Sequence, residues 1–448
     1  MPARTASNED RSLLGRMLAN LAWLIGGKGF GAVCSLAYLA ILTRSLGVRD
    51  FGHFSLIFGT AQALIAIAGF QTWRVVVRYG AEHVHRGEWN AFGRLGMISG
   101  LFDALGAVLG CVIAYFAFYH FAEELSLNPA LVDLGFWFCV ASLWALVSAP
   151  TGILRALDRF DLAVYIEAVV PAGRLLAAVA IWLTGPSLLR FLIAWAAIDL
   201  LEAAIYWIVA RWKCPQAFRS STLAGLGAIR GENPGLTRFF LVNYFSGSAD
   251  AVLRQGPLLA VGYFVGTSAA GLFRLAHQLA NGLAKLSSLL SRAAYAEILR
   301  ARVAAKVEEF RKLVIQTSVL AALGSALVVI LVALIGAFLL QVIGGSAFRS
   351  AHPILVALTL AASFELAAVA FEPVLHSTGR AALSLWTKLA RIVIVLAALV
   401  LLVGNAQALG IAWAVAIGGL AGYLMLGSLT WWSLRNLDEE DLRQSVPT

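Results

Sequence analysis

The chain has 448 residues, of which 60% are hydrophobic and only 13% are charged, and its mean hydropathy is +0.81. Because soluble domains carry roughly 25% charged residues, this composition excludes a soluble globular protein. The apolar runs are about 20 residues or longer, as a bilayer core of roughly 30 Å requires, and the sequence lacks the alternating strands of about ten residues that are typical of membrane β-barrels. We therefore predict an all-α polytopic membrane protein.

Twelve apolar runs follow one another along the chain. The first comes after the polar and basic segment MPARTASNEDRSLLGR and is too long for the core of a signal peptide, so we interpret it as an uncleaved span. The spans are predicted near 18–43, 52–73, 93–118, 131–154, 162–183, 188–210, 237–263, 269–291, 313–338, 352–376, 380–403 and 406–432.

Basic residues gather on one side of these spans. That side holds both chain ends, a predicted loop at 74–94, and Lys388 and Arg391 at the start of the eleventh span, and it contains 25 of the 34 lysines and arginines. The opposite side holds Arg44, Arg49, Arg190 and Arg349. The positive-inside rule therefore predicts that both termini are cytoplasmic. The net charge of +9 then lies in loops beside anionic lipid, and we expect no nucleic-acid partner because no soluble module carries the charge.

A short turn motif occurs once in each half of the chain, as LGVRDFGHFSL from Leu46 and as VGTSAAGLFRL from Val265. Four pairs of residues match at a constant separation of 219 positions: Gly47 with Gly266, Gly52 with Gly271, Phe54 with Phe273, and Leu56 with Leu275. Both halves begin on the cytoplasmic side, so the pattern predicts two parallel six-helix bundles. Transporters built from such repeats place their substrate between the halves, here in a central polar cavity.

The longest polar interruption, RWKCPQAFRSSTLAGLGAIRGENPG, falls between the sixth and seventh spans and reads as a linker. The predicted organisation is a cytoplasmic N-tail at 1–17, a six-helix bundle at 18–210, a cytoplasmic linker at 211–236, a second six-helix bundle at 237–433, and a cytoplasmic C-tail at 434–448.

The eighth span carries a polar stripe. A charge at mid-span costs roughly 2.5–3.5 kcal/mol on insertion scales, so such residues normally face protein or water. Spacings of four and three residues place the following on one helix face: Arg274, Gln278, Asn281, Lys285, Ser288 and Arg292. The stripe either lines a water-filled cavity or binds the seventh span through buried hydrogen bonds.

Three further cations lie inside predicted spans. Lys28, within GGKGFG, either faces the cavity or takes part in an internal ion pair or snorkels. Arg174 shares a helix face with Glu167, and pairing between helices is the alternative to a role in binding. Arg254 lies one turn after Asp250, at a spacing that allows the two to pair.

Acidic residues inside the spans are candidates for coupling transport to protons or sodium: Asp103, Asp250, Glu365 and Glu372. The alternative is that they balance the charge of the cavity cations. His277 beside Arg274 is either a proton relay or a packing residue. The sequence offers no nucleophile–base pair, metal-ligand cluster or nucleotide loop, so we expect no enzyme activity, no metal and no cofactor.

Several stretches are similar to one family. ILTRSLGVRDFGHFSLIFG and GFQTWRVVVRYGAE resemble the start of polysaccharide exporters and O-antigen-type flippases of the multidrug/oligosaccharidyl-lipid/polysaccharide exporter superfamily. GILRALDRFDLAVYIEAVVPAGRLL, YFVGTSAAGLFRLAHQLA, GGSAFRSAHPILVALTLA and FEPVLHSTGRAALSL follow in the order of the same pattern. The resemblance implies a V-shaped pair of six-helix bundles around a central cavity. It also implies that a polyprenyl-diphosphate-linked oligosaccharide is the cargo.

We therefore expect a bacterial inner-membrane flippase for surface polysaccharide biosynthesis that works by alternating access. Its partners would be the lipid-linked oligosaccharide, membrane lipids, and a polymerase or other polysaccharide assembly proteins. The expected substrate-binding residues are Lys28, Arg174, Arg254, Arg274, Gln278, Asn281 and Lys285. The alternative is a cation-coupled multidrug or small-molecule exporter of the same superfamily. A membrane-bound polymerase or ligase is a third class, against which the short periplasmic loops argue.

Overall fold

The computed structural model describes residues 13–121, 127–218, 225, 227–282, 307–369, 371–377 and 381–435. The side chains of residues 13–28 lie outside this description, as do those of a few residues inside later helices. The described secondary structure is entirely helical, which confirms the predicted fold class.

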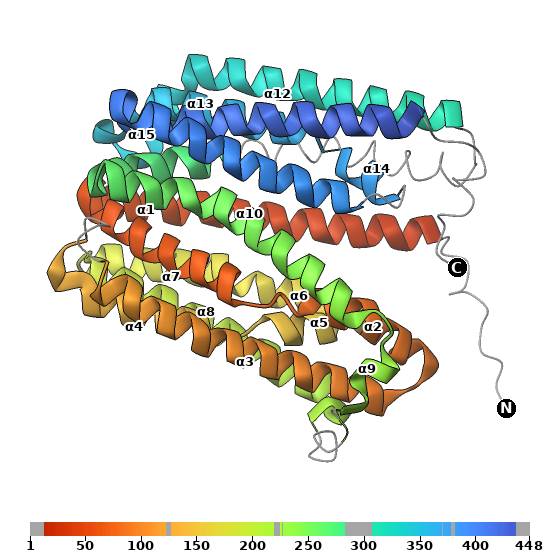
Figure 1. Ribbon diagram of the computed structural model, residues 1–448. Helices are drawn as coiled ribbons and strands as arrows, with labels where there is room; N and C mark the ends of the chain where they lie inside the picture. Colours follow the sequence, from red (N-terminus) through yellow and green to blue (C-terminus); the bar gives the residue numbers. More distant parts are fainter. Residues whose placement is uncertain are drawn as a thin grey trace. The chain divides into compact units, whose positions relative to one another are not determined.

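The chain divides into two compact units. Figure 1 labels the helices that they contain. Unit 1 consists of Met1–Ser45, Leu64–Tyr115 and Phe136–Tyr244, and unit 2 consists of Leu46–Ala63, Phe116–Gly135 and Phe245–Thr448. The helices of unit 1 are the two ends of α1 (Leu13–Ala68), α2 (Trp73–Arg86), most of α3 (Trp89–Tyr119), most of α4 (Val132–Trp144), α5 (Ser148–Ala156), α6 (Phe160–Glu167), α7 (Val169–Thr184), α8 (Leu188–Lys213), α9 (Ile229–Glu232) and the start of α10 (Leu236–Phe264).

Unit 2 contains the middle of α1, the rest of α10, a helix at 267–282, α12 (Val307–Gly344), α13 (His352–Ala367), α14 (Phe371–Ser377) and α15 (Ala381–Arg435). Helix α13 packs against both α12 and α15 and buries Leu355, Leu358 and Leu366. Helices α1 and α15 are each interrupted by one residue with a non-helical backbone, Gly47 and Gln407 respectively.

Eight helical segments among the described residues are long and apolar enough to cross a membrane. They are Gly29–Ala68, Trp89–Tyr119, Pro129–Ala156, Phe160–Thr184, Leu188–Lys213, Val314–Gly344, Ser346–Ala367 and Leu383–Arg435. The first has 40 residues and the last 53, so at about 1.5 Å per residue each exceeds a single crossing of roughly 30 Å. The predicted multi-pass membrane protein is confirmed, while the count of twelve crossings stays a prediction.

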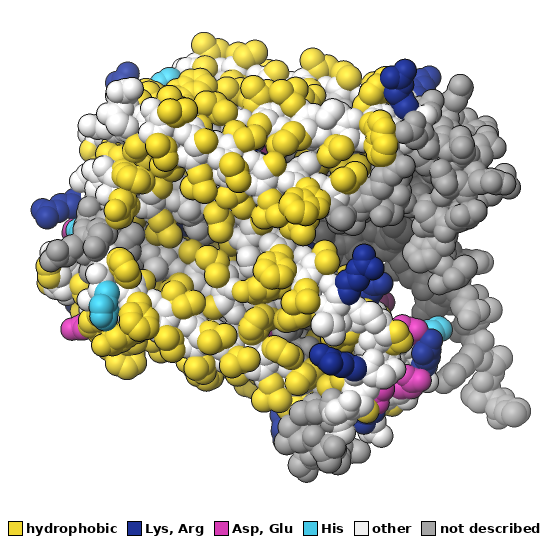
Figure 2. All heavy atoms as spheres, viewed as in Figure 1, with side chains coloured by type: hydrophobic (Ala, Val, Ile, Leu, Met, Phe, Trp, Pro, Cys, Tyr) yellow, Lys and Arg dark blue, Asp and Glu magenta, His cyan; other side chains and the backbone are white. Residues whose placement is uncertain are grey.

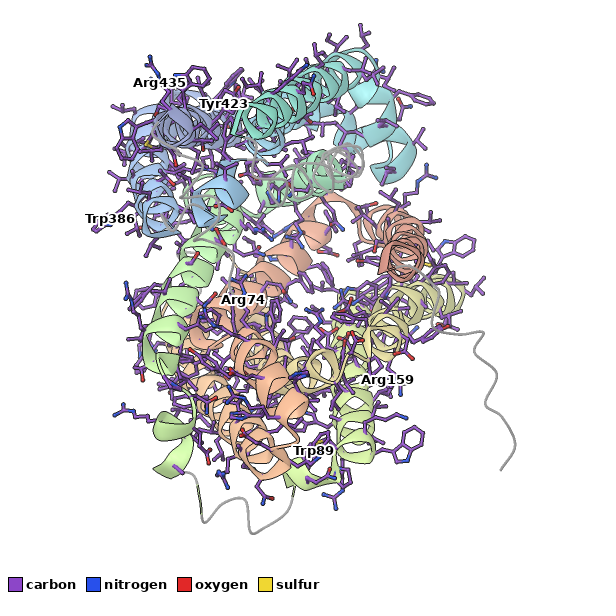
Figure 3. The ribbon with its side chains drawn as sticks, turned by 90° about the vertical axis from the view of Figure 1, so that its right-hand side faces the viewer. Arg74, Trp89, Arg159, Trp386, Tyr423 and Arg435 are labelled. Carbon is purple, nitrogen blue, oxygen red and sulfur yellow. The ribbon has the colours of Figure 1, made fainter. Side chains whose placement is uncertain are left out.

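The surfaces of these helices are apolar, as contact with lipid requires. Leu334 of α12 and Leu401 of α15 are each 74% exposed. Hydrophobic side chains cover much of the visible face in Figure 2. Trp386 of α15 is 67% exposed and points away from its helix (Figure 3). In water such an apolar surface would be strongly unfavourable, so its natural surroundings are lipid tails.

The duplicated turn has a glycine with positive φ in both copies, and both copies belong to unit 2. Gly47 has φ 70° and Gly266 has φ 108°, values that L side chains rarely adopt. Five residues after each of them stands a glycine in close contact: a Cβ atom on Gly52 would lie 2.0 Å from the carbonyl oxygen of Thr267, and one on Gly271 would lie 2.5 Å from that of Val48. The matched Phe and Leu residues that follow are all buried.

The segment predicted as a loop at 74–94 is helical, which corrects the sequence-based expectation. It forms α2 and the start of α3, joined at Gly87, which has φ 72°. Helix α2 is amphipathic and buries Val75, Val76 and Tyr79 inside unit 1. Its high content of charged residues suggested a loop, but these residues occupy one face of a helix whose other face is packed.

The predicted linker at 211–236 begins inside α8, which continues to Lys213, and its described end is held in place by polar contacts. Glu232 of α9 forms a two-point ion pair with Arg94 of α3. Buried His83 of α2 lies with Nδ1 2.7 Å from Glu88 Oε2 and with Nε2 3.0 Å from Asn233 Oδ1. These contacts attach the end of the linker to unit 1.

Helix breaks occur at the end of the predicted span 52–73 and inside the predicted span 131–154. Between α1 and α2 the chain leaves the helix at 69–72, where Gln71 has φ 48°. Between α4 and α5 it does so at 145–147. Pro150 stands in the first turn of α5, where its missing amide hydrogen breaks no helical hydrogen bond. If α4 continued without a break, the same proline would remove one of its internal hydrogen bonds.

Candidate functional site

The most deeply buried ion pair among the described residues of unit 1 is formed by Arg174 of α7 and Asp199 of α8. Arg174 Nη2 lies 2.7 Å from Asp199 Oδ1, and the two side chains are only 10% and 14% exposed. The guanidinium also lies over the ring of Trp195, 5.5 Å from its centre. Arg174 therefore has an acidic neighbour on another helix, as one of the two sequence-based interpretations expected, but the acid is Asp199 rather than Glu167.

Glu167 has a different partner, Arg155 at the end of α5, with 2.9 Å between Nη2 and Oε1. The Arg155 guanidinium lies 4.9 Å from the ring centre of Trp73. Arg74, labelled in Figure 3, lies 5.4 Å from the same ring centre and donates a hydrogen bond of 3.1 Å to Asn243 Oδ1 of α10. Unit 1 thus contains two neighbouring arginines on α2 and α5, both engaged with protein groups.

Asp103 of α3 connects the two helix breaks. Its Oδ1 accepts a hydrogen bond of 2.7 Å from the hydroxyl of Thr72, in the first break. Its Oδ2 accepts one of 2.8 Å from the backbone amide of Ala149, in the first turn of α5 after the second break. The residue is 5% exposed. A carboxylate at a helix N-terminus satisfies an amide that the helix leaves unpaired.

A cavity of about 370 Å³ lies at the same place and is lined by residues of unit 1. Its polar lining includes Gln71, Asp103, Ser142, Ser148 and Arg155. Ser142 is 3% exposed, and its hydroxyl has no hydrogen-bond partner. The sequence singled out Asp103 but not the cavity, because the two breaks are far apart along the chain and only the fold brings them together.

In unit 2, Lys388 of α15 holds two of the acids predicted for ion coupling. Its Nζ lies 3.1 Å from Asp250 of α10 and 3.4 Å from Glu372 of α14. Glu372 also accepts a hydrogen bond of 3.0 Å from Ser384. The expected pairing of Asp250 with Arg254 is therefore replaced by pairing with Lys388, because a cation from another helix approaches Asp250 directly. Arg254 is exposed on the same helix.

The other predicted acid of unit 2, Glu365 of α13, pairs with Arg391 of α15. Lys388 and Arg391 were assigned to the cytoplasmic side from the sequence, and their role inside the helix bundle was missed. The available signal was their spacing of three residues, which places both on one face of a predicted span. Charge balance of the acids, the alternative left open from the sequence, agrees with both pairs.

The polar stripe of the eighth span is described as far as residue 282. Arg274, Gln278 and Asn281 are partly exposed, whereas Leu275 and Leu279 between them are buried. The Arg274 guanidinium lies 5.3 Å from the ring centre of Phe58, and Asn281 Nδ2 lies 3.1 Å from His277 Nε2. The polar face is thus the more accessible face of this helix. Lys285, Ser288 and Arg292 lie outside the described residues, as does the side chain of Lys28 on α1.

In each unit these residues place charged and amide groups between packed helices, whose outer surfaces are apolar. Such groups can hydrogen-bond hydroxyls and neutralise an anion only where the bundle admits a polar ligand. Each unit also contains acids that already have cationic or amide partners. The arrangement is suited to holding polar groups inside a membrane.

Residues 17–295, more than half of the chain, match the family described as "Polysaccharide biosynthesis protein". The chain is 25% identical over 295 residues to the inner membrane protein YghQ of Escherichia coli strain K12, a match that covers 63% of this chain and 80% of that protein. The solved structure of the lipid II flippase MurJ in an inward closed conformation is similar with a TM-score of 0.73 at 12% identity, covering 95% of this chain and 90% of MurJ.

An inward-facing multidrug resistance MATE family transporter of the MOP superfamily is similar with a TM-score of 0.64 at 14% identity, and the match covers 93% of this chain and 96% of that one. At such low identity these two structures show the shared fold alone. The family match extends over the first helices, the cavity at the helix breaks and the polar eighth span. The chain therefore belongs to the polysaccharide biosynthesis protein family and has the fold of the MOP-superfamily transporters.

Proposed function

We propose that this protein is a flippase that moves a polyprenyl-diphosphate-linked oligosaccharide from the inner to the outer leaflet of the bacterial inner membrane. The observation that carries the proposal is the match of residues 17–295 to the polysaccharide biosynthesis family. The moved glycan then serves surface polysaccharide synthesis, where a polymerase or another assembly protein uses it. Both termini are cytoplasmic in this proposal.

The physical problem of such a cargo is its polar head. Diphosphate and sugars lose their hydration in a lipid core, at a cost of several kcal/mol for each unsatisfied polar group. In this proposal the cations expected from the sequence, Lys28, Arg254, Arg274 and Lys285, neutralise the diphosphate, and the amides of Gln278 and Asn281 bind sugar hydroxyls. The prenyl tail stays in lipid throughout.

Arg174 is a weaker member of this set than the sequence suggested. Its pairing with Asp199 leaves the two side chains together close to neutral, so diphosphate must compete with a carboxylate 2.7 Å away. Arg254 is the stronger candidate, since it is exposed on α10 and no ion pair to it occurs among the described residues. We propose alternating access as the mechanism, with the cations exposed to one side of the membrane at a time.

The second candidate function is a cation-coupled exporter of drugs or small molecules. It is favoured by the similarity of fold to a multidrug MATE transporter and by the presence of acids inside the helices, among them Asp103. The flippase is preferred because Lys388, shared by Asp250 and Glu372, and Arg391, paired with Glu365, offset two of these three negative charges and so reduce the attraction for a cationic drug.

The experiment that tests this choice is deletion of the gene in its native host. The flippase function predicts loss of one surface polysaccharide and accumulation of its lipid-linked precursor on the cytoplasmic side. Expression in a host without drug exporters is predicted to leave resistance unchanged. Unaltered surface glycans together with a gain of drug resistance would contradict the proposal and establish the alternative.

A further inference from the structure

The described end of the linker is attached to α2 by a polar cluster of three residues, here named the clasp. They are His83 in the last turn of α2, Glu88 just before α3, and Asn233 directly after α9, all within unit 1. The ring of His83 lies between the other two, with Nδ1 2.7 Å from Glu88 Oε2 and Nε2 3.0 Å from Asn233 Oδ1. His83 is 3% exposed and Asn233 2%, so the ring is almost fully withdrawn from water.

The local backbone brings each partner to the ring. Helix α2 ends at Gly87, whose φ of 72° turns the chain back, and the amide of Glu88 then donates to the carbonyl of His83 at 2.8 Å. This turn returns the Glu88 carboxylate to the ring. Asn233 ends α9, where its amide and its side-chain Nδ2 each donate to the carbonyl of Ile229 at 3.0 Å.

Both partners of the ring are hydrogen-bond acceptors. Asn233 uses Nδ2 for the carbonyl of Ile229, so the atom that faces His83 is Oδ1, which only accepts. The opposite orientation of the amide would set Oδ1 against that carbonyl oxygen. An ionised carboxylate, such as that of Glu88, likewise only accepts. Both contacts are therefore satisfied when the imidazole carries a proton on each ring nitrogen, which is its charged form.

A neutral imidazole satisfies one of these contacts and opposes the other. Its single N–H donates either to Glu88 or to Asn233, and the lone pair of the other nitrogen then faces an acceptor oxygen. Histidine gains or loses this proton between about pH 5 and about pH 8. The clasp is therefore strongest on the acidic side of this range and weakens as the pH rises.

The other charged groups beside the clasp have partners of their own. Arg94 of α3 pairs with Glu232, the residue before Asn233. Arg86 of α2 pairs with Glu82 on the exposed face of that helix. Glu88 is the acid that approaches the ring of His83, so the charge of the clasp depends on the proton that this ring shares with it.

The clasp lies where the chain passes from the linker into α10. The hydroxyl of Tyr79 donates to the carbonyl of Pro234 at 3.2 Å, and its ring lies 5.9 Å from that of Phe239, centre to centre. The first turns of α10, up to Tyr244, belong to unit 1, whereas the helix from Phe245 onward belongs to unit 2. The clasp therefore helps to hold the start of a helix that continues into the other unit.

We propose that the clasp is a proton-dependent switch: doubly protonated His83 holds the end of the linker and the start of α10 on unit 1, and loss of one proton to water releases them. The positive-inside rule assigns this side of the protein to the cytoplasm, so acidification of the cytoplasm tightens the attachment. The switch goes beyond the proposed function, because it concerns the linker and does not depend on which cargo the protein moves.

The test is hydrogen–deuterium exchange of the backbone amides at 229–236, measured by mass spectrometry on the purified full-length protein in detergent. Exchange at about pH 6 and at about pH 8 is corrected for the chemical exchange rate, so that the remaining difference reports local opening. The wild type is expected to be at least about tenfold more protected at the lower pH, the effect of one hydrogen bond to a charged group.

Glu88→Gln separates the proton dependence from packing. The new amide can donate to Nδ1 of a neutral His83 while Nε2–H donates to Asn233, so both contacts are kept without the second proton. This variant is expected to be protected at both pH values, with a ratio near one. His83→Gln is expected to be weakly protected at both, because its one amide nitrogen cannot donate in both directions of the ring.

His85→Gln is the matched control, since His85 is exposed two residues further along α2, and its protection ratio should equal that of the wild type. A wild-type ratio near one would overturn the proposal. So would a wild-type ratio retained in Glu88→Gln, or one lost in His85→Gln. No glycan lipid is present in the assay, so its outcome is independent of the flippase function.

Discussion

Gly52 and Gly271, matched positions of the duplicated turn, pack directly against each other. A Cβ atom on Gly271 would lie 3.1 Å from the amide nitrogen of Gly52 and 2.5 Å from the carbonyl oxygen of Val48. The sequence places these glycines 219 positions apart, and unit 2 contains both turns. Repetition of the motif therefore serves a contact between its two copies and supplies a glycine with positive φ in each.

Gly271→Ala is predicted to destabilise the protein by about 1–3 kcal/mol, toward the upper end, because backbone atoms rather than a movable side chain would meet the new methyl group. Gly29→Ala is the control, since a Cβ atom at Gly29 has nothing within 4 Å. Melting temperatures in detergent compare the two. Equal melting temperatures for both variants would refute the close glycine contact.

The pair of Arg174 and Asp199 provides the second prediction. Asp199→Asn leaves a buried guanidinium without its acid and is predicted to cost about 3–5 kcal/mol, the range for breaking a buried pair, because both side chains are at most 14% exposed. Arg174→Gln combined with Asp199→Asn is predicted to restore stability, as measured by thermal unfolding. Glycan export in the double variant then decides the role of Arg174: full export means that Arg174 only balances Asp199.

The third prediction separates the role of Lys388, which pairs with Asp250, from that of Arg254, which lies four residues after Asp250 on α10. Lys388→Gln removes the partner of Asp250 and Glu372, and it is predicted to lower stability by only about 1 kcal/mol, because these acids are 36% and 41% exposed. Arg254→Gln is predicted to leave stability unchanged and to reduce export about ten- to a hundredfold, the effect of losing a charge-assisted bond to diphosphate. Thermal unfolding and export are measured on the same preparations. A large loss of stability in Arg254→Gln would exclude a role limited to cargo.

The fourth prediction concerns orientation. Reporter fusions after Ser187, Gly266 and Gly404 should report the periplasm, and fusions after Arg219 and Lys306 the cytoplasm, since the basic residues concentrate on the side of the latter two. The activities of alkaline phosphatase and of a fluorescent protein, which each work on one side only, read out the orientation. An inverted pattern would contradict both the orientation and the count of twelve crossings.

Composition and periodicity were sufficient to predict the all-helical membrane fold, because long apolar runs in a weakly charged chain have few alternatives. The duplicated glycines could be predicted from the sequence because a backbone with positive φ favours glycine in both copies of the turn. The linker was predicted from its prolines and glycines, but its attachment through Glu232 to Arg94 was not, because that contact joins positions far apart in the sequence.

Ion pairing inside the spans was the least predictable part. A spacing of four residues placed Asp250 beside Arg254, yet the chosen partner, Lys388, lies on another helix. Similarly, Arg174 shares a face with Glu167 but pairs with Asp199. Local spacing identifies neighbours within one helix, whereas buried charges are satisfied by whichever helix packs against them. The break at 69–72 lies at the end of the span predicted at 52–73, whereas the break at 145–147 escaped prediction because a polar residue inside a span is compatible with either a break or a pore.

The most direct test of the central claim uses vesicles that contain the purified protein and a polyprenyl-diphosphate-linked oligosaccharide in both leaflets. A glycosidase that cannot cross the membrane digests the outward-facing glycan. The account predicts that the protected glycan becomes accessible in vesicles with the protein and stays protected in empty vesicles. Vesicles with the protein that retain the same protected fraction as empty ones, while accumulating a cationic drug, would contradict it.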